Sequence, residues 1–76
     1  MPHVIVKMLP GRSEQLKAKL AQEMTKAVTS TLNLREDSVS VAIEDVQEKD
    51  WTEQVYKTDI IGKPATIYKK PGYNPL

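Results

Sequence analysis

The sequence predicts an α+β fold in which a strand, a long helix and a second strand follow one another in a single domain of residues 1–76. Residues 3–8 and 39–46 alternate along the chain and are rich in β-branched side chains, as strands are. Between them, apolar residues recur every three to four positions, as on one face of an amphipathic helix. This order of elements predicts two parallel strands joined by a crossover, which is nearly always right-handed.

Each predicted strand has two distinct faces. In the first strand, which ends at the turn Leu9-Pro10-Gly11, one face carries Val4, Val6 and Met8 and the other carries His3, Ile5 and Lys7. In the second, the faces carry Val39, Val41 and Ile43 or Ser40, Ala42 and Glu44. The crossover helix covers only one side of the pair. We therefore expect the other side, with Ile5 and Ala42, to pack against a second copy of the chain.

The crossover helix is predicted at residues 14–32. Ser13 is a good N-cap, Glu14 suits the positive first turn, and Asn33 suits a left-handed cap at the end. The predicted apolar stripe consists of Leu16, Leu20, Met24, Ala27, Val28 and Thr31. Its polar neighbours are expected to face solvent: Lys17, Lys19, Gln22, Glu23 and Lys26.

The C-terminal third is predicted to hold two short elements. Asp50-Trp51-Thr52-Glu53 matches a capping box with aspartate as the cap, which predicts a short helix over about 51–57. Gly62 and Pro64 break the chain, and 65–68 can form a short C-terminal strand. A turn-rich tail follows.

Composition excludes several classes of protein and site. With 76 residues the core is thin, and the absence of cysteine excludes disulfides and thiolate metal sites. A single histidine, His3, excludes a His-rich metal cluster, so oligomerisation is the remaining source of support. Eleven basic and ten acidic residues give a net charge of +1, which predicts neither nucleic-acid nor membrane-surface binding. We expect no transmembrane segment and no signal peptide, and a cytoplasmic protein.

Pro2, directly after the start methionine, has two interpretations. As the first residue of a strand, it is tolerated because no ladder hydrogen bond is lost there. Alternatively, removal of Met1 would leave the nitrogen of Pro2 as a free secondary amine that can accept a proton.

Three pieces of the sequence decide between these interpretations: Pro2 before a strand, Gly11-Arg12-Ser13 before an amphipathic helix, and the strand Ser38-Val39-Ser40-Val41. Together they resemble the 4-oxalocrotonate tautomerase family, over about the first fifty residues. The resemblance implies a β-α-β subunit whose sheet pairs with that of a second subunit. It favours a homodimer, with a hexamer of three dimers as the next choice, because the tail after Asp50 is longer than in the hexameric diacid isomerases.

The resemblance also implies a cofactor-independent isomerase that shifts a proton in enol or dienol 2-hydroxy (2-oxo) acids. Pro2 would be the general base, since an α-amine titrates near neutrality and an apolar pocket lowers its pKa further. Arg12 would bind the substrate carboxylate; its alternative is an exposed loop arginine. No metal and no organic cofactor is expected.

Ser40 and Trp51 complete the predicted substrate site. Ser40 stands where the diacid isomerases of the family have a second arginine, so we expect a monoacid substrate. Trp51 aligns with an aromatic residue of the family's pocket wall, or else anchors the short helix. Glu53 resembles the water-activating carboxylate of related hydratases and dehalogenases, although the capping box explains it more simply. Arg35 could approach from the preceding loop, and a lone histidine such as His3 is more often structural than catalytic.

A second hypothesis belongs to another class. The chain could be a non-catalytic oligomeric scaffold or small-acid-binding protein that keeps this fold without its chemistry. A retained Met1, or full activity after Pro2→Ala, would favour it.

Overall fold

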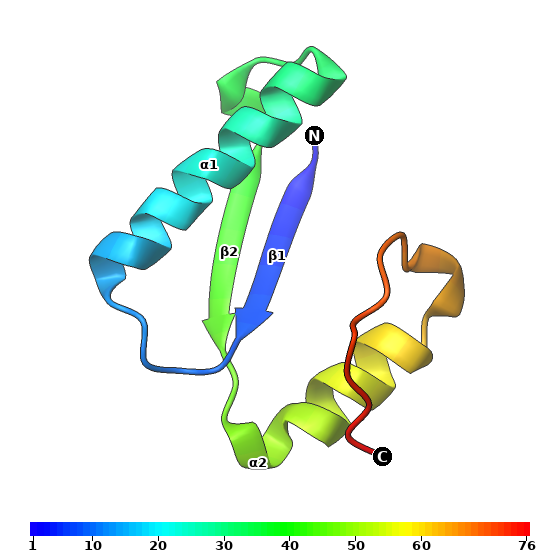
Figure 1. The fold of residues 1–76 in the computed structure, drawn as a ribbon. Coiled ribbons are helices and arrows are strands. Elements are labelled where there is room, and N and C mark those ends of the chain that lie inside the picture. The colour runs from blue at the N-terminus through cyan, green and yellow to red at the C-terminus, as the bar shows by residue number, and fades with distance from the viewer. The chain divides into compact units, whose positions relative to one another are not determined.

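A computed structural model describes all of residues 1–76, and the chain divides into two compact units, residues 1–45 and 46–76. The first unit contains β1 (His3–Met8), α1 (Glu14–Leu32), a 3-10 turn η1 (Glu36–Ser38) and β2 (Ser40–Asp45). The second contains α2 (Glu48–Trp51), the π-helical segment η2 (Thr52–Ile61) and a 3-10 turn η3 (Pro64–Thr66). Figure 1 shows α1 running alongside the strands of the first unit.

The β-α-β arrangement of the first unit is confirmed. β1 and β2 are hydrogen-bonded and parallel, with Val4 opposite Val41 and Val6 opposite Ile43. These four side chains lie on one face because side chains alternate along a strand. The second strand is one residue shorter at each end than the predicted 39–46.

Helix α1 has the predicted limits because both of its ends are capped locally. The Oγ of Ser13 accepts a hydrogen bond from the backbone N–H of Leu16 at 3.1 Å. At the other end, Asn33 adopts the left-handed conformation with φ = 56°, and its N–H donates to the carbonyl of Thr29.

The face that α1 packs against the rest of the unit differs from the predicted stripe. Leu20, Met24 and Val28 are half-buried as predicted, but Leu16 is 56% exposed. Lys17 was predicted to face solvent, and that prediction is wrong: its side chain is only 16% exposed. The reason is an ion pair of 2.8 Å from its Nζ to Oδ2 of Asp45, the last residue of β2.

The other face of the sheet, called the open face below, is not covered by any element of the first unit. It carries Ile5, which is 51% exposed, opposite Ala42, and the flanking register pairs His3–Ser40 and Lys7–Glu44. No side chain of the first unit is fully buried. An exposed isoleucine at the middle of a sheet is the surface expected where a second subunit docks, and the dimer itself stays a prediction.

In the C-terminal third the predicted second helix is present, but its predicted start and the predicted strand are wrong. The helix begins at Glu48, with Gln47 as N-cap and no side-chain cap, so Asp50 lies inside it rather than capping it. The predicted strand at 65–68 is absent, and Pro64–Thr66 form a 3-10 turn instead. A strand needs a neighbour to satisfy its backbone groups, whereas proline is well suited to the first position of a helical turn.

The second unit has a small aromatic core. Val55 and Tyr56 are buried, and the ring of Tyr56 lies 5.7 Å from that of Tyr73, centroid to centroid. The indole Nε1 of Trp51 donates a hydrogen bond of 2.9 Å to the hydroxyl of Tyr73. These contacts hold the tail against the helix. None of the helices in the chain has the length and apolar character needed to span a membrane.

Candidate active site

Pro2, His3 and Ser40 lie together where the two parallel strands begin. The carbonyl of Pro2 accepts a hydrogen bond from the backbone N–H of Ser40 at 3.2 Å, which extends the ladder one residue beyond β1. On the open face of the sheet, Nδ1 of His3 lies 2.6 Å from Oγ of Ser40. Pro2 is half-buried and is held by β2 rather than being a loose terminal residue.

The chemistry of Pro2 depends on Met1. While Met1 is attached, the nitrogen of Pro2 is an amide whose lone pair is delocalised into the peptide bond, so it cannot act as a base. Met1 is fully exposed and makes no contact that would oppose its removal. Its loss would convert the same nitrogen into a secondary amine at the edge of the sheet.

Arg12 lies in the loop between β1 and α1, at the opposite end of the sheet from Pro2. Gly11 directs this loop with φ = +121°, a conformation that favours glycine. Arg12 is exposed and forms no ion pair, so its guanidinium can take up a ligand carboxylate.

Lys17 is another cation at this end of the sheet, and it is already engaged. Its Nζ contacts Asp45 at 2.8 Å and Glu14 at 3.6 Å. The hydrogen bond to Asp45 raises the pKa of Lys17 above its ordinary 10.5, followed by smaller electrostatic effects of the same sign from both carboxylates, against a lowering by desolvation. Arg12, not Lys17, is therefore the cation available to an anionic ligand.

A single chain does not bring Pro2 and Arg12 to one ligand. They flank β1, and the intervening residues of an extended strand span roughly 20 Å at about 3.3 Å per residue. Figure 1 shows the N-terminus and the loop before α1 at opposite ends of β1. That separation exceeds the length of a small 2-oxo acid.

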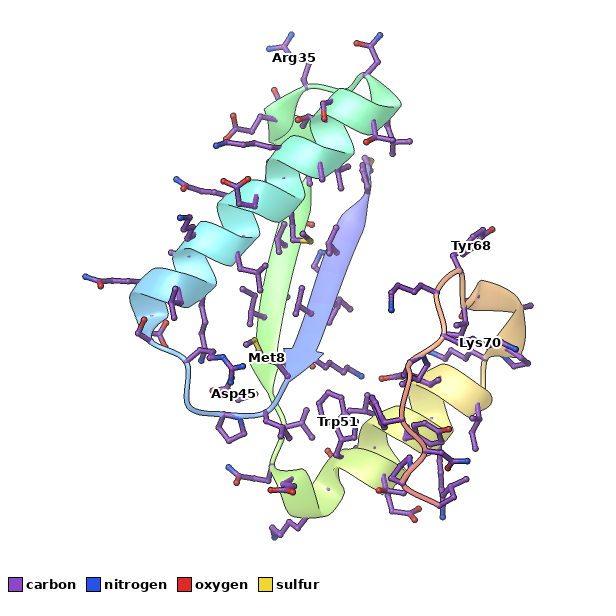
Figure 2. All side chains as sticks on the ribbon, in the orientation of Figure 1. Met8, Arg35, Asp45, Trp51, Tyr68 and Lys70 are labelled. Carbon is purple, nitrogen blue, oxygen red and sulfur yellow. The ribbon has the colours of Figure 1, made fainter.

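Arg35 does not take part in the Ser40 contact. Its side chain is 89% exposed and lies 3.7 Å from the carboxylate of Asp37. In Figure 2 it projects away from the sheet, at the end opposite to Met8 and Asp45. The polar partner of Ser40 is His3, a contact that the sequence analysis missed. Aligning the apolar faces of the two strands, Val4 with Val41, would have placed His3 opposite Ser40.

Trp51 and Glu53 both have structural partners in the second unit. Trp51 is hydrogen-bonded to Tyr73, as described above. The carboxylate of Glu53 accepts a hydrogen bond of 2.6 Å from Nζ of Lys57, one helical turn further on. Glu53 therefore serves an ion pair on the helix surface and not the predicted capping box.

The class of the protein follows from comparison with known families. The sequence model of the Tautomerase family, described as tautomerase enzyme, matches residues 2–56, beginning at Pro2. The match spans both strands, α1 and α2. The chain belongs to the tautomerase family, and with it to the isomerases.

Individual relatives extend this similarity to the whole chain. A protein named probable tautomerase from Xylella fastidiosa (strain 9a5c) is 45% identical over 76 residues, covering 100% of this chain and 93% of its own. Tautomerase PptA of Cronobacter sakazakii (strain ATCC BAA-894) is 39% identical over 74 residues, covering 96% and 97%. Tautomerase PptA of Escherichia coli (strain SMS-3-5 / SECEC) is 36% identical over 75 residues, covering 97% and 99%. The predicted membership of the tautomerase family is confirmed.

Proposed function

We propose that the chain, acting as one domain, catalyses keto–enol tautomerisation of small 2-hydroxy (2-oxo) acids with Pro2 as the general base. The observation that carries the proposal is the position of Pro2. It stands half-buried before β1, its carbonyl is tied to β2, and only Met1 blocks its nitrogen. A base must be held in place relative to its substrate, and this ladder bond provides that constraint.

The proposed step needs one proton carrier. The Pro2 amine accepts the proton of the enol hydroxyl, which leaves an enolate. The oxygen then forms the carbonyl as the electron pair of the C=C bond takes up a proton at the adjacent carbon. The protonated Pro2 supplies that proton and returns to its neutral form. Atoms and charges balance over the cycle, and negative charge develops on the enolate between the two transfers.

Arg12 is proposed to bind the substrate carboxylate and to stabilise this charge. Since Pro2 and Arg12 of one chain lie roughly 20 Å apart, we propose that the Arg12 of a second copy completes each site. The open face of the sheet around Ile5 supports such an assembly, with a homodimer as the first choice and a hexamer as the second.

Ser40 and Trp51 are proposed to line the substrate site. A serine cannot form the two parallel hydrogen bonds that an arginine forms with a second carboxylate, which favours a monoacid. We expect a higher kcat/KM for phenylenolpyruvate than for the dienol diacid 2-hydroxyhexa-2,4-dienedioate. Ser40→Arg should move this ratio toward the diacid. An unchanged ratio would argue against Ser40 as the residue that selects the monoacid.

The deciding experiment measures the intact mass of the protein and its rate of ketonisation of phenylenolpyruvate. Intact-mass measurement of untagged protein should give a mass short by one methionine, and Pro2→Ala should lower kcat for ketonisation of phenylenolpyruvate by about 10²-fold or more, the usual contribution of a general base. Pro75→Ala, the same substitution in the tail, is the matched control and should retain activity. Full activity with Met1 retained, or in Pro2→Ala, would refute the proposal.

A further inference from the structure

A short polar contact on the open face of the sheet joins His3 to Ser40. Nδ1 of His3 and Oγ of Ser40 are 2.6 Å apart, although the two residues are 37 positions apart in the sequence. They are register partners at the first pair of β1 and β2, immediately next to Pro2. Both residues are exposed on this chain. They lie at the end of the open face next to the proposed base, beside the Ile5–Ala42 pair at which a second copy is proposed to dock.

We propose that His3 is a positioning residue that makes the Ser40 hydroxyl a hydrogen-bond donor to the anionic substrate. The inference rests on the proposed function, in which Ser40 lines the site. It assigns to His3 a role in substrate binding that is separate from the proton transfer at Pro2.

The physical basis is that a hydroxyl has one proton to donate. When Nδ1 of His3 carries hydrogen, it donates to Oγ of Ser40, and the hydroxyl proton is free to point at a carboxylate or carbonyl oxygen. When Nδ1 is bare, Ser40 donates to His3 instead and presents only lone pairs, which repel an anion. The state of one ring nitrogen therefore decides whether Ser40 attracts or repels the substrate.

The hydrogen on Nδ1 separates the role of His3 from that of Pro2. The contact with Ser40 affects how the anionic substrate is bound, whereas Pro2 transfers a proton, so His3 should act on KM and Pro2 on kcat.

Few charged groups face His3. On the same side of the sheet, Lys7 of β1 and Glu44 of β2 form the register pair at the far end, and helix α1 packs against the opposite side. The nitrogen of Pro2 is the adjacent ionisable group along the chain once Met1 is lost. No carboxylate forms an ion pair with His3, so Ser40 is its only polar side-chain partner.

The kinetic test uses phenylenolpyruvate and measures KM and kcat. Ser40→Ala removes the donor and should raise KM by about tenfold, the worth of one hydrogen bond to a charged group. His3→Asn keeps an N–H near the position of Nδ1 and should keep the low KM. His3→Ala leaves the hydroxyl without a fixed direction, so its KM should lie between those of the wild type and Ser40→Ala, and it should have no further effect when Ser40 is already alanine.

Glu44→Gln is the matched control, because it changes a charge on the same face at the far end of β2. It should keep the wild-type KM. If His3→Asn raises KM as much as Ser40→Ala does, or if His3→Ala leaves KM unchanged while Ser40→Ala raises it, the role of His3 is refuted and the proposed function stands. If Pro2→Ala is fully active, the proposed function is what fails.

A measurement independent of activity tests the contact itself. The ¹⁵N chemical shifts of the single histidine report how far each ring nitrogen is protonated. The Nδ1 shift should change on Ser40→Ala and not on Glu44→Gln. Adding phenylpyruvate should move it toward the protonated form in the wild type and in Glu44→Gln, but not in Ser40→Ala. A shift that ignores both Ser40→Ala and the ligand would overturn the proposal.

Discussion

The distance between Pro2 and Arg12 predicts that each active site contains residues from two copies of the chain. On a single chain these residues flank the six residues of β1, roughly 20 Å apart. Each site must then draw Pro2 from one copy and Arg12 from another. Arg12→Ala alone should lower kcat/KM by about 10- to 100-fold, since a hydrogen-bonded charge pair is worth about 1.5–3 kcal/mol.

Mixing the two inactive variants tests this directly. When Pro2→Ala and Arg12→Ala subunits exchange at equal amounts, half of the dimers are mixed, and a mixed two-fold dimer has one intact site of two. The mixture should therefore recover about a quarter of the wild-type rate of phenylenolpyruvate ketonisation. This recovery stands well above the residual rates of either variant alone.

The control is native mass spectrometry with one variant carrying a mass tag, which shows that subunits have exchanged. Activity that recovers although the subunits have not exchanged would contradict the reasoning. So would subunits that exchange although activity does not recover. In the second case Arg12 would serve a site of its own chain or none, and the estimate from strand length would not describe the assembled site.

Three further predictions concern contacts in each unit. Asp45→Asn should lower the free energy of unfolding at neutral pH, because the raised pKa of Lys17 means that folding stabilises its ionised form. Measured by urea denaturation, the difference from wild type should shrink as pH rises above 10.5. Gly62→Ala should cost about 1–3 kcal/mol, because a Cβ would lie 2.5 and 2.8 Å from two backbone carbonyl oxygens of the preceding turn. Trp51→Phe should cost about 1 kcal/mol by removing the hydrogen bond to Tyr73, and so should Tyr73→Phe.

Each of these has a comparison that can contradict it. A stability difference for Asp45→Asn that grows above pH 10.5 has the wrong sign for the Lys17 ion pair. Gly72→Ala, where the added Cβ meets nothing within 4 Å, should be near neutral, and equal losses at Gly62 and Gly72 would argue against steric contact. If Trp51→Phe raises KM while Tyr73→Phe does not, Trp51 contacts substrate as well as the tail.

Local signals in the sequence were sufficient where the interacting groups are close along the chain. Ser13 caps the first turn through the N–H of Leu16, and Asn33 closes the last turn through the carbonyl of Thr29. The limits of α1 were therefore correct to the residue. The alternation in β1 was equally clear, because side-chain period is a property of a single strand.

Where the competing signals were of similar strength, the prediction failed. Asp50 and Glu53 have the spacing of a capping box, yet the helix starts three residues earlier than predicted and Glu53 pairs with Lys57. Residues 65–68 have strand-forming side chains, but no neighbouring strand satisfies their backbone, and Pro64 begins a helical turn instead. Intrinsic preference is a weak determinant when tertiary partners differ.

Sequence patterns were thus enough to establish the order of strand, helix and strand and the caps of α1, and the family resemblance proposed Pro2 as base and Arg12 as carboxylate ligand. Only the folded chain decided that Lys17 is drawn to Asp45, that His3 meets Ser40, and that Pro2 and Arg12 lie at opposite ends of β1. The physical reason is how far apart the interacting residues lie along the chain. Caps and periodicity depend on hydrogen bonds between residues within about one turn, whereas these contacts depend on strand register and on where the crossover sets the helix.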